Sequence, residues 1–392
     1  MADFHYLIVG GGMTADAAVQ GIRMTDSSGS VGIIAREHHP PYNRPPLSKG
    51  LWKGDPLDGI WRNTAAMKAE VLLAREAVRI DADAHTVADA AGNAYSYRRL
   101  LLATGGTPRR LQGDPGGIVY FRTLDDYRTV REAGAAGASF AVIGGGFIGS
   151  EIAAALALTG SRVTMIFPEA SIGAHVYPAP FARFLTEYFS GKGVTVRAAV
   201  RVLGIERRGK KYTVRTSEGA DLEADMVVAG LGITPNVDIA ASAGIATDNG
   251  IRVDEFLKTS RPDIFAAGDV ASFFSPHLNR VIRVEHEDNA LTMGTTAGRN
   301  MAGESQRYDH LPFFYSDLFD IGYEAVGEID SRLEAVADWR EQFRQGVVYY
   351  MKAGRIRGVL LVNTWGKVDA ARALIAGGAP YAPPDVVGLI RD

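Results

Sequence analysis

The chain has 392 residues, a length that accommodates two or three domains. Its 42 Lys and Arg residues nearly balance 45 Asp and Glu residues, and the net charge of -3 gives no electrostatic reason to expect a nucleic-acid ligand. The sequence contains no cysteine, which excludes disulfides, thiolate-held iron–sulfur clusters, Cys-ligated metals and covalent thiol intermediates.

The N-terminal sequence MADFHYLIVGGG lacks the basic start, the long apolar stretch and the cleavage site of a signal peptide. No apolar run is long enough to cross a bilayer, and no His, Asp and Glu residues cluster with metal-ligand spacing. We therefore expect a cytoplasmic protein with no membrane span and no metal site. The absence of cysteine suits such a reducing compartment.

The first predicted element is a buried parallel strand at residues 6–9, followed by a glycine turn and a helix at 16–24. The turn is a GxGxxA motif, in which the backbone and the helix N-terminus can accept a pyrophosphate. A second strand at 30–37 ends at an acid placed to bind ribose hydroxyls. The candidate residues of this first dinucleotide site are Gly10, Gly12, Met13, Thr14, Ala15 and Glu37.

Residues 140–154, FAVIGGGFIGSEIAA, repeat this strand–turn–helix pattern with a full GxGxxG motif and a helix at 151–159. The strand at 161–169 ends at Glu169. An acid there favours a 2′-hydroxyl and repels a 2′-phosphate, so we expect NADH rather than NADPH. The alternative is that Glu169 is a solvated loop residue. The candidate residues of this second site are Gly145, Gly146, Phe147, Ile148 and Glu169.

Two such units predict an α/β fold with two doubly wound, Rossmann-like domains. Further strands are expected at residues 99–103, 194–197, 212–216 and 226–230. The basic cluster at 207–211 is interpreted as a solvated hairpin tip, with docking of an acidic electron carrier as the alternative.

From about residue 313 the pattern changes to strands at 346–352 and 355–362 and a helix at 367–375, typical of a small α+β domain. The tail GGAPYAPPD is too rich in Gly and Pro for a packed element. The predicted domains are an FAD-binding domain at 1–110 and 235–310, an NAD-binding domain at 111–234 and a C-terminal α+β domain at 311–392.

Two separate dinucleotide sites indicate one tightly held and one exchanging cofactor, and FAD with NADH is the natural pair. Three further segments support this interpretation. The turn LLATG contributes Thr104 and Gly105, and the strand end IFAAGD contributes Gly268 and Asp269, an acid suited to a polyol such as the ribityl chain. The Pro-stiffened loop YNRPPLSK carries Arg44 and Lys49.

With these motifs the chain resembles the pyridine-nucleotide-dependent flavoprotein reductases with two dinucleotide-binding domains. The resemblance also rests on the stretches YNRPPLSKGLW, LLATGGTPR, VIGGGFIGSEIA, LGITPN, AAGDV, RVEHEDNA and FFYSDLFDIGYEAVG. Within them it is similar to the branch of oxygenase-coupled ferredoxin and rubredoxin reductases and apoptosis-inducing factor. The similar stretches run from the first strand into the C-terminal domain, so the resemblance covers nearly the whole chain.

The resemblance implies four catalytic residues. Lys49 would lie near flavin N5 and pair with Glu151, and Phe147 would cover the flavin face and move aside for the nicotinamide. His286 would lie at the flavin ring, at the start of a helix whose N-terminus polarises the flavin carbonyl. The other residues implied to bind the two cofactors are Arg44, Val78, Arg122, Asp269, Gly232, Glu285, Tyr315, Glu324 and Asn363.

The chain departs from apoptosis-inducing factor in three places. Tyr315 stands where that protein has Trp, the stretch after FPE lacks its lysine, and its long insertion between the strands near Ala337 and Val347 is missing. The resemblance therefore does not extend to redox-linked dimerisation or a role in cell death.

We expect an enzyme, an FAD-dependent NAD(P)H oxidoreductase that prefers NADH and needs no protein nucleophile. Hydride passes from nicotinamide C4 to flavin N5, and the electrons go to a ferredoxin or rubredoxin-type protein or to a quinone. Without cysteine, disulfide reduction and sulfenate chemistry are excluded by composition. The alternative is a redox sensor that oxidises NADH slowly, keeps a long-lived charge-transfer complex and signals through a partner.

Overall fold

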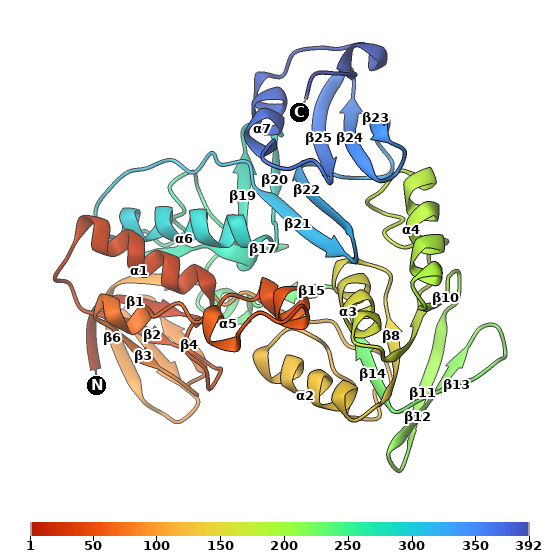
Figure 1. Ribbon diagram of the computed structural model, residues 1–392. Coiled ribbons are helices and arrows are strands. Elements are labelled where there is room, and N and C mark those ends of the chain that lie inside the picture. Colours follow the sequence, from red (N-terminus) through yellow and green to blue (C-terminus); the bar gives the residue numbers. More distant parts are fainter. Residues whose placement is uncertain (1, 391–392) are drawn as a thin grey trace. The chain divides into compact units, whose positions relative to one another are not determined.

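The computed structural model describes residues 2–390, which form two compact units interleaved along the chain (Figure 1). Unit 1 comprises the chain up to Asn43, Asp58–Thr107 and Thr234–Phe313. Unit 2 comprises Arg44–Leu57, Pro108–Ile233 and the chain from Phe314 onward. Within residues 2–390, no helix combines the length and the hydropathy that crossing a bilayer requires.

Unit 1 is built on a sheet whose strand order is β3-β2-β1-β6-β5-β4, with β18 paired to the carboxyl half of β6. The pairs β1–β2, β1–β6, β2–β3 and β6–β18 are parallel, so these strands end at one edge. The strands are β1 (Ala2–Val9), β2 (Val31–Ile34), β3 (Ala69–Leu72), β4 (Ala77–Asp81), β5 (Thr86–Asp89), β6 (Ala94–Leu102) and β18 (Ile264–Ala266).

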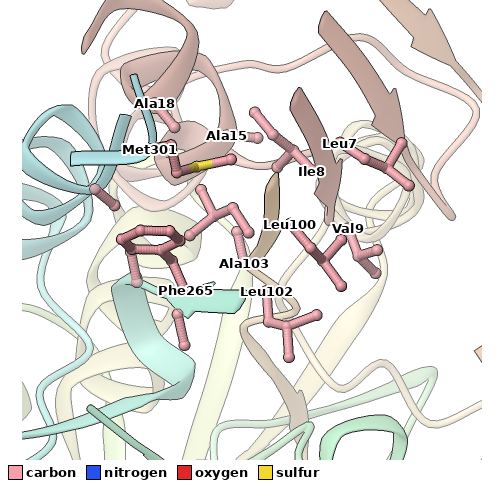
Figure 2. Packing of buried hydrophobic residues seen from close by; sticks show 14 of the residues in the cluster. Leu7, Ile8, Val9, Ala15, Ala18, Leu100, Leu102, Ala103, Phe265 and Met301 are labelled. Atoms are coloured by element: carbon pink, nitrogen blue, oxygen red, sulfur yellow. The ribbon is translucent and has the colours of Figure 1, made fainter. Parts of the chain in front are cut away.

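The core of unit 1 lies between this sheet and the helices α1 (Met13–Thr25) and α6 (Glu287–Met301). Figure 2 shows Leu7 and Ile8 of β1 beside Leu100 of β6, with Phe265 of β18 and Met301 of α6. Residues 6–9 are buried on both faces of the sheet, which explains their continuous apolar run.

Glycines allow α1 and α6 to pack with their backbones in contact. A Cβ on Gly298 would lie 2.1 Å from the carbonyl oxygen of Ala18, and one on Gly294 would lie 2.5 Å from that of Thr14. On the facing helix, a Cβ on Gly21 would lie 2.1 Å from the carbonyl oxygen of Thr295. No larger residue fits at these positions without separating the helices.

The rest of unit 1 includes a small sheet of order β16-β17-β19-β20 and a short helix. These elements are α5 (Asp238–Ser242), β16 (Thr247–Asp248), β17 (Gly250–Arg252), β19 (Ala271–Ser275) and β20 (Arg280–Ile282). The short strands β7 (Gly106–Pro108) and β15 (Ile233–Pro235) contain two of the points where the chain passes from one unit to the other.

Unit 2 contains a parallel sheet of order β10-β9-β8-β14 and a three-stranded antiparallel meander. The parallel strands are β8 (Ser139–Ile143), β9 (Arg162–Ile166), β10 (Thr195–Arg197) and β14 (Met226–Ala229). The meander strands are β11 (Val202–Arg208), β12 (Lys211–Thr216) and β13 (Leu222–Ala224). The helices are α2 (Leu124–Ala135), α3 (Phe147–Leu158) and α4 (Ala179–Gly191).

Unit 2 also holds a five-stranded sheet of order β21-β22-β25-β24-β23. Its elements are β21 (Phe313–Leu318), β22 (Ile321–Gly327), β23 (Glu334–Glu341), β24 (Gln345–Lys352), β25 (Arg355–Val362) and α7 (Val368–Gly377). The Pro-stiffened loop forms two short 3-10 helices, η1 (Pro45–Ser48) and η2 (Gly50–Trp52), which pack against α3. Unit 2 thus contains nearly all of the predicted NAD-binding range and of the predicted C-terminal range, and the three-domain division stays a prediction.

The structure confirms the predicted strands and helices and corrects several of their ends. Both glycine-turn helices begin earlier than predicted, at Met13 and Phe147, because each follows its turn directly. The strands predicted to end at Glu37 and Glu169 end at Ile34 and Ile166, so both acids lie in the loops that follow.

The tail GGAPYAPPD, predicted to hold no packed element, has no buried residue, but a short 3-10 helix, η6 (Pro383–Val386), begins within it. The buried residues Val386 and Ile390 lie beyond that stretch. Proline at the start of η6 supplies the fixed backbone angle that such a turn needs.

Candidate active site

In unit 1, the predicted FAD residues gather at the edge where the parallel strands end. Gly10 follows β1, Thr104 follows β6 and Gly268 follows β18, while Glu37 lies in the loop after β2. Backbone hydrogen bonds tie these loops together: the amide of Gly10 donates to Ile34 and that of Ala103 to Val9. Ligands of open α/β sheets bind at this edge.

The glycine turn of unit 1 is tightly packed where it leaves the sheet and open at the helix N-terminus. Gly10 has φ +120°, and a Cβ there would lie 2.1 Å from the carbonyl oxygen of Ala103. Gly12, the N-cap of α1, makes no side-chain cap, and a Cβ there would meet nothing within 4 Å. An uncapped helix N-terminus beside open space fits the pyrophosphate of a dinucleotide such as FAD.

The neighbouring residues are held in place by their own hydrogen bonds. Glu37 accepts a hydrogen bond from the Tyr42 hydroxyl at 2.7 Å, and Thr104 exchanges two 2.8 Å bonds with Asn236. Gly268 has φ +77°, and a Cβ there would lie 2.3 Å from the Thr14 hydroxyl, so α1 and the Gly268 turn approach closely. The turn therefore needs glycine at this position.

His286 is the N-cap of α6 in unit 1, and the residue is partly exposed while its Nδ1 atom is buried. Burial lowers its pKa to about 4, and the negative charges of Asp269 and Asp288 oppose this shift without cancelling it. The imidazole is therefore neutral at physiological pH. The preceding residue, Glu285, accepts a hydrogen bond from Arg283 at 2.9 Å, and Arg283 also donates to the carbonyl of Asp269.

Val78 is the one predicted FAD residue of unit 1 that lies away from the glycine turn in the sheet order. It sits on β4 at an irregularity in its pairing with β5, and its side chain is half exposed. Its role in cofactor binding stays a prediction.

In unit 2, the second glycine turn repeats the same geometry. Gly144 has φ +112°, and a Cβ there would lie 2.4 Å from the carbonyl oxygen of Gly230. Gly146, the N-cap of α3, makes no side-chain cap and has nothing within 4 Å of a would-be Cβ. The turn fits a second dinucleotide pyrophosphate. Gly232, with φ +77°, lies in the loop after the neighbouring strand β14.

Glu169 follows β9 beside this turn and is about a third exposed. Its Oε1 lies 3.4 Å from Nε2 of His175, and its backbone carbonyl accepts from the amide of Ala199 at 2.7 Å. The carboxylate is thus placed by its loop rather than by the strand, in reach of a ligand at the end of β9.

Lys49 and Glu151 form a buried ion pair inside unit 2, as the resemblance implied. Lys49 Nζ donates to Glu151 Oε2 at 2.7 Å, and the two side chains are 11% and 4% exposed. The Nζ also lies 5.3 Å from the ring centroid of Tyr315, within the range of a cation–π contact. Lys49 comes from the loop between η1 and η2, Glu151 from α3 and Tyr315 from β21.

Other predicted residues of unit 2 lie near these elements. Phe147 and Ile148, in the first turn of α3, are each 38% exposed, and the Phe147 ring meets Phe314 edge-on at 5.0 Å. Arg44 donates to the carbonyl of Arg122 at 2.9 Å, which fixes the start of the Pro-stiffened loop. Phe147 and Ile148, as partly exposed apolar residues at the start of α3, suit a stacking surface for a ligand ring.

Glu324 and Asn363 differ in how far their polar atoms are already used in hydrogen bonds within the protein. Burial raises the pKa of Glu324, partly offset by a hydrogen bond from the amide of Gly366, and its Oε2 is buried without a partner among residues 2–390. The Asn363 carboxamide accepts from Gly322 and donates to the carbonyls of Asp320 and Arg344. Its hydrogen bonds hold the sheet ends, and its role in NADH binding stays a prediction.

Sequence reasoning missed two serines and two tyrosines that surround the ion pair. Ser48 and Ser316 both hydrogen-bond Glu151, and the hydroxyls of Tyr177 and Tyr323 continue the network. Each serine is adjacent in sequence to a residue that was predicted, Lys49 or Tyr315. That adjacency was the only signal in the sequence, since nothing local shows that the segments meet.

Comparison with known proteins agrees with this geometry. Residues 4–294 match the family described as pyridine nucleotide-disulphide oxidoreductase, and residues 297–342 match the C-terminal domain of mitochondrion-associated apoptosis-inducing factor. The chain belongs to the pyridine nucleotide-disulphide oxidoreductase family. It is an FAD-dependent NAD(P)H oxidoreductase, and its cofactors are FAD and NAD(H).

Curated relatives match along most of the chain. The ferredoxin–NAD(+) reductase component of the anthranilate 1,2-dioxygenase system of Burkholderia cepacia is 33% identical, over 96% of this chain and 95% of the relative. Mitochondrial apoptosis-inducing factor 1 of Dictyostelium discoideum is 31% identical, over 95% of this chain and 78% of the relative.

Among solved structures, the covalent putidaredoxin reductase–putidaredoxin complex matches with a TM-score of 0.92. The identity is 30%, over 99% of this chain and 96% of that chain. The fold class predicted from the two glycine motifs is confirmed by this match. Since the sequence has no cysteine, the chain holds no redox-active disulfide despite the name of its family.

Proposed function

We propose that this oxidoreductase takes its hydride from NADH and passes the electrons to a ferredoxin- or rubredoxin-type protein. The observation that carries the proposal is its similarity, over nearly the full length of both chains, to reductases named for such carriers. Composition supports it by exclusion, because a chain without cysteine has no thiol through which to reduce a disulfide.

Each unit would hold one cofactor. In unit 1, the glycine turn, Glu37 and the Gly268–Asp269 turn would bind FAD, which when bound accepts hydride from NADH and releases electrons to a one-electron carrier. In unit 2, the second glycine turn and Glu169 would bind NADH, and the Glu169 carboxylate would repel a 2′-phosphate. Phe147 would cover the flavin face and move aside as the nicotinamide enters.

In this proposal Lys49 places a positive charge near the flavin, where negative charge accumulates on reduction. Glu151 keeps that ammonium in one position, and the neutral imidazole of His286 adds no charge of its own. The protein contributes position and charge, and no side chain forms a covalent bond to the substrate.

A second candidate function is favoured by the match of residues 297–342 to the C-terminal domain of apoptosis-inducing factor. In that alternative, slow NADH oxidation and a long-lived reduced complex would change the association of the protein with a partner. The two candidates differ in turnover, because a reductase must reoxidise quickly with its carrier.

Anaerobic stopped-flow reduction of the purified yellow protein by NADH and by NADPH tests the proposal. The expected result is fast bleaching that is selective for NADH, followed by fast reoxidation with a ferredoxin or rubredoxin. Fast reoxidation by a quinone alone would replace the protein acceptor with a small one. Slow bleaching to a long-wavelength band that persists in air would favour the sensor.

A further inference from the structure

Glu151 receives more hydrogen bonds than its pairing with Lys49 requires. Ser48 Oγ donates to Oε2 at 2.5 Å, the oxygen that also binds Lys49 Nζ, and Ser316 Oγ donates to Oε1 at 2.6 Å. The donors come from two segments far apart in the sequence, since Ser48 and Lys49 are consecutive residues at the end of η1 and Ser316 lies on β21. Ser48, Glu151 and Ser316 are all buried.

The network continues behind Ser316 into two fully buried tyrosines. The Tyr177 hydroxyl donates to the Tyr323 hydroxyl at 2.6 Å, and the Tyr323 hydroxyl lies next to that of Ser316. Ser316 gives its one hydroxyl proton to Glu151, so towards Tyr323 it can act only as an acceptor.

Both tyrosines remain protonated throughout the physiological range, because burial raises the pKa of Tyr177 and of Tyr323. The chain thus delivers hydrogen-bond donors, and no negative charge of its own, to the carboxylate. Hydrogen bonds in such a series polarise one another in a low-dielectric interior, which strengthens the last one on Glu151.

We propose that Ser48, Ser316, Tyr323 and Tyr177 are positioning residues of the hydride-transfer site, which hold the Glu151 carboxylate in one orientation so that Lys49 is fixed. Three donors on two oxygens oppose any tilt or shift of this carboxylate, because each such movement lengthens at least one of the bonds. The inference rests on the proposed function, in which Lys49 acts on the flavin.

The same hydrogen bonds could instead serve only to stabilise the fold, and the experiment must distinguish that role from positioning Glu151. Apolar residues of similar shape often stabilise a core better than a buried polar network does. The variants are Ser316→Ala, Tyr323→Phe and Tyr177→Phe, with Ser316→Thr as the variant that keeps the hydroxyl. Ser275→Ala, which removes a buried hydroxyl of unit 1, is the matched control.

The readouts are kcat and KM for NADH, the flavin midpoint potential and the thermal unfolding temperature of the holoprotein. A hydrogen bond to a charged group contributes enough for Ser316→Ala to lower kcat about tenfold, with KM within about twofold of wild type. The midpoint potential is expected to become more negative, since a loosened Lys49 stabilises the reduced flavin less. Tyr323→Phe and Tyr177→Phe should give successively smaller effects, and Ser316→Thr should restore kcat.

A double-mutant cycle shows whether Ser316 acts through the carboxylate. In a Glu151→Gln background, Ser316→Ala is expected to change kcat and the potential no further. Additive effects, or variants with lowered unfolding temperatures but wild-type kcat and potential, would overturn the inference and leave the proposed function standing. A wild-type protein that binds no flavin or does not oxidise NADH would remove the proposed function, and this inference with it.

Discussion

Lys49 Nζ lies 2.7 Å from Glu151 Oε2 in a setting where both side chains are almost completely buried. Removing one partner of a buried pair leaves a charge without compensation, whereas removing both is far less costly. We expect Lys49→Met and Glu151→Gln each to lower the free energy of unfolding by about 3 kcal/mol. The double variant should lose clearly less than the sum.

Activity should not follow stability in this series. The double variant regains stability but still lacks the ammonium, so flavin reduction by NADH should stay slow in all three variants. Urea denaturation and stopped-flow reduction measured on the same preparations provide the comparison. A double variant that recovers the wild-type reduction rate would remove Lys49 from the mechanism.

Gly12 and Gly146 allow cofactor binding to be separated from folding. A Cβ at either position meets no atom of the protein within 4 Å, so the alanine variants should fold with stabilities within about 1 kcal/mol of wild type. Gly12→Ala should lose FAD during gel filtration, and Gly146→Ala should raise the KM for NADH while keeping its flavin. Normal flavin content in Gly12→Ala would contradict the placement of the pyrophosphate.

Gly298 should respond in the opposite way, because it is a packing position. A Cβ there would lie 2.1 Å from the Ala18 carbonyl oxygen, so Gly298→Ala must push α6 away from α1. We expect a loss of about 2–3 kcal/mol in the free energy of unfolding, followed by weaker FAD binding as the N-terminus of α1 shifts. Circular dichroism melts of the apoprotein measure the first effect without the second. Gly303→Ala is a poor control because of its φ of +104°, whereas Gly191→Ala, in an open position, is a suitable one.

His286 should make stability depend on pH. Its pKa is lowered from 6.5 in the unfolded chain to about 4 in the folded chain, so between these values the unfolded state binds a proton that the folded state does not. The free energy of unfolding should therefore fall as the pH drops from 6.5 to 4, by roughly 3 kcal/mol in total, and this contribution should level off below pH 4.

The comparison that isolates this contribution is His286→Leu. Urea denaturation at several pH values gives the free energy of unfolding of the two apoproteins. Above pH 6.5 the two free energies should change with pH in the same way, and between pH 6.5 and 4 that of the wild type should fall more steeply. Parallel curves over the whole range would show that the imidazole has the same pKa in the folded and the unfolded protein.

Glu169 should control the choice of nucleotide. Its side chain is about a third exposed at the end of β9, beside the second glycine turn. Glu169→Arg replaces a repulsive charge with an attractive one for a 2′-phosphate, so the ratio of kcat/KM for NADPH to that for NADH should rise by about one hundredfold. Glu187→Arg on α4, an exposed position, should leave the ratio unchanged. An unchanged ratio in Glu169→Arg would support the reading of Glu169 as a solvated loop residue.

Much of the fold was predictable because the glycine turns impose a local geometry. The runs before Gly10 and Gly144, and the Ala-rich stretches after them, require a strand, a turn and a helix whatever the rest of the chain does. The acids Glu37 and Glu169 were predicted at strand tips but lie in loops, since alternation of residue types does not reveal where pairing stops.

The network around Glu151 could not be predicted in the same way. Ser48, Ser316 and Tyr323 are ordinary residues in their local sequences, and their roles depend on contacts between segments more than a hundred residues apart. The close packing of Gly294 and Gly298 against α1 has the same origin, because glycine within a helix signals a contact but does not name its partner.

The interleaving of the two units along the chain affects how the protein folds during its synthesis on the ribosome. The strand β1 is made long before two of its packing partners, because its sheet lacks β18 and its helix α1 lacks α6 until residues 264–301 have been synthesised. At about 5–20 residues per second, that delay is about fifteen to sixty seconds. During that time an apolar strand and the bare glycine face of a helix are exposed, so nascent chains should depend on chaperones until α6 emerges.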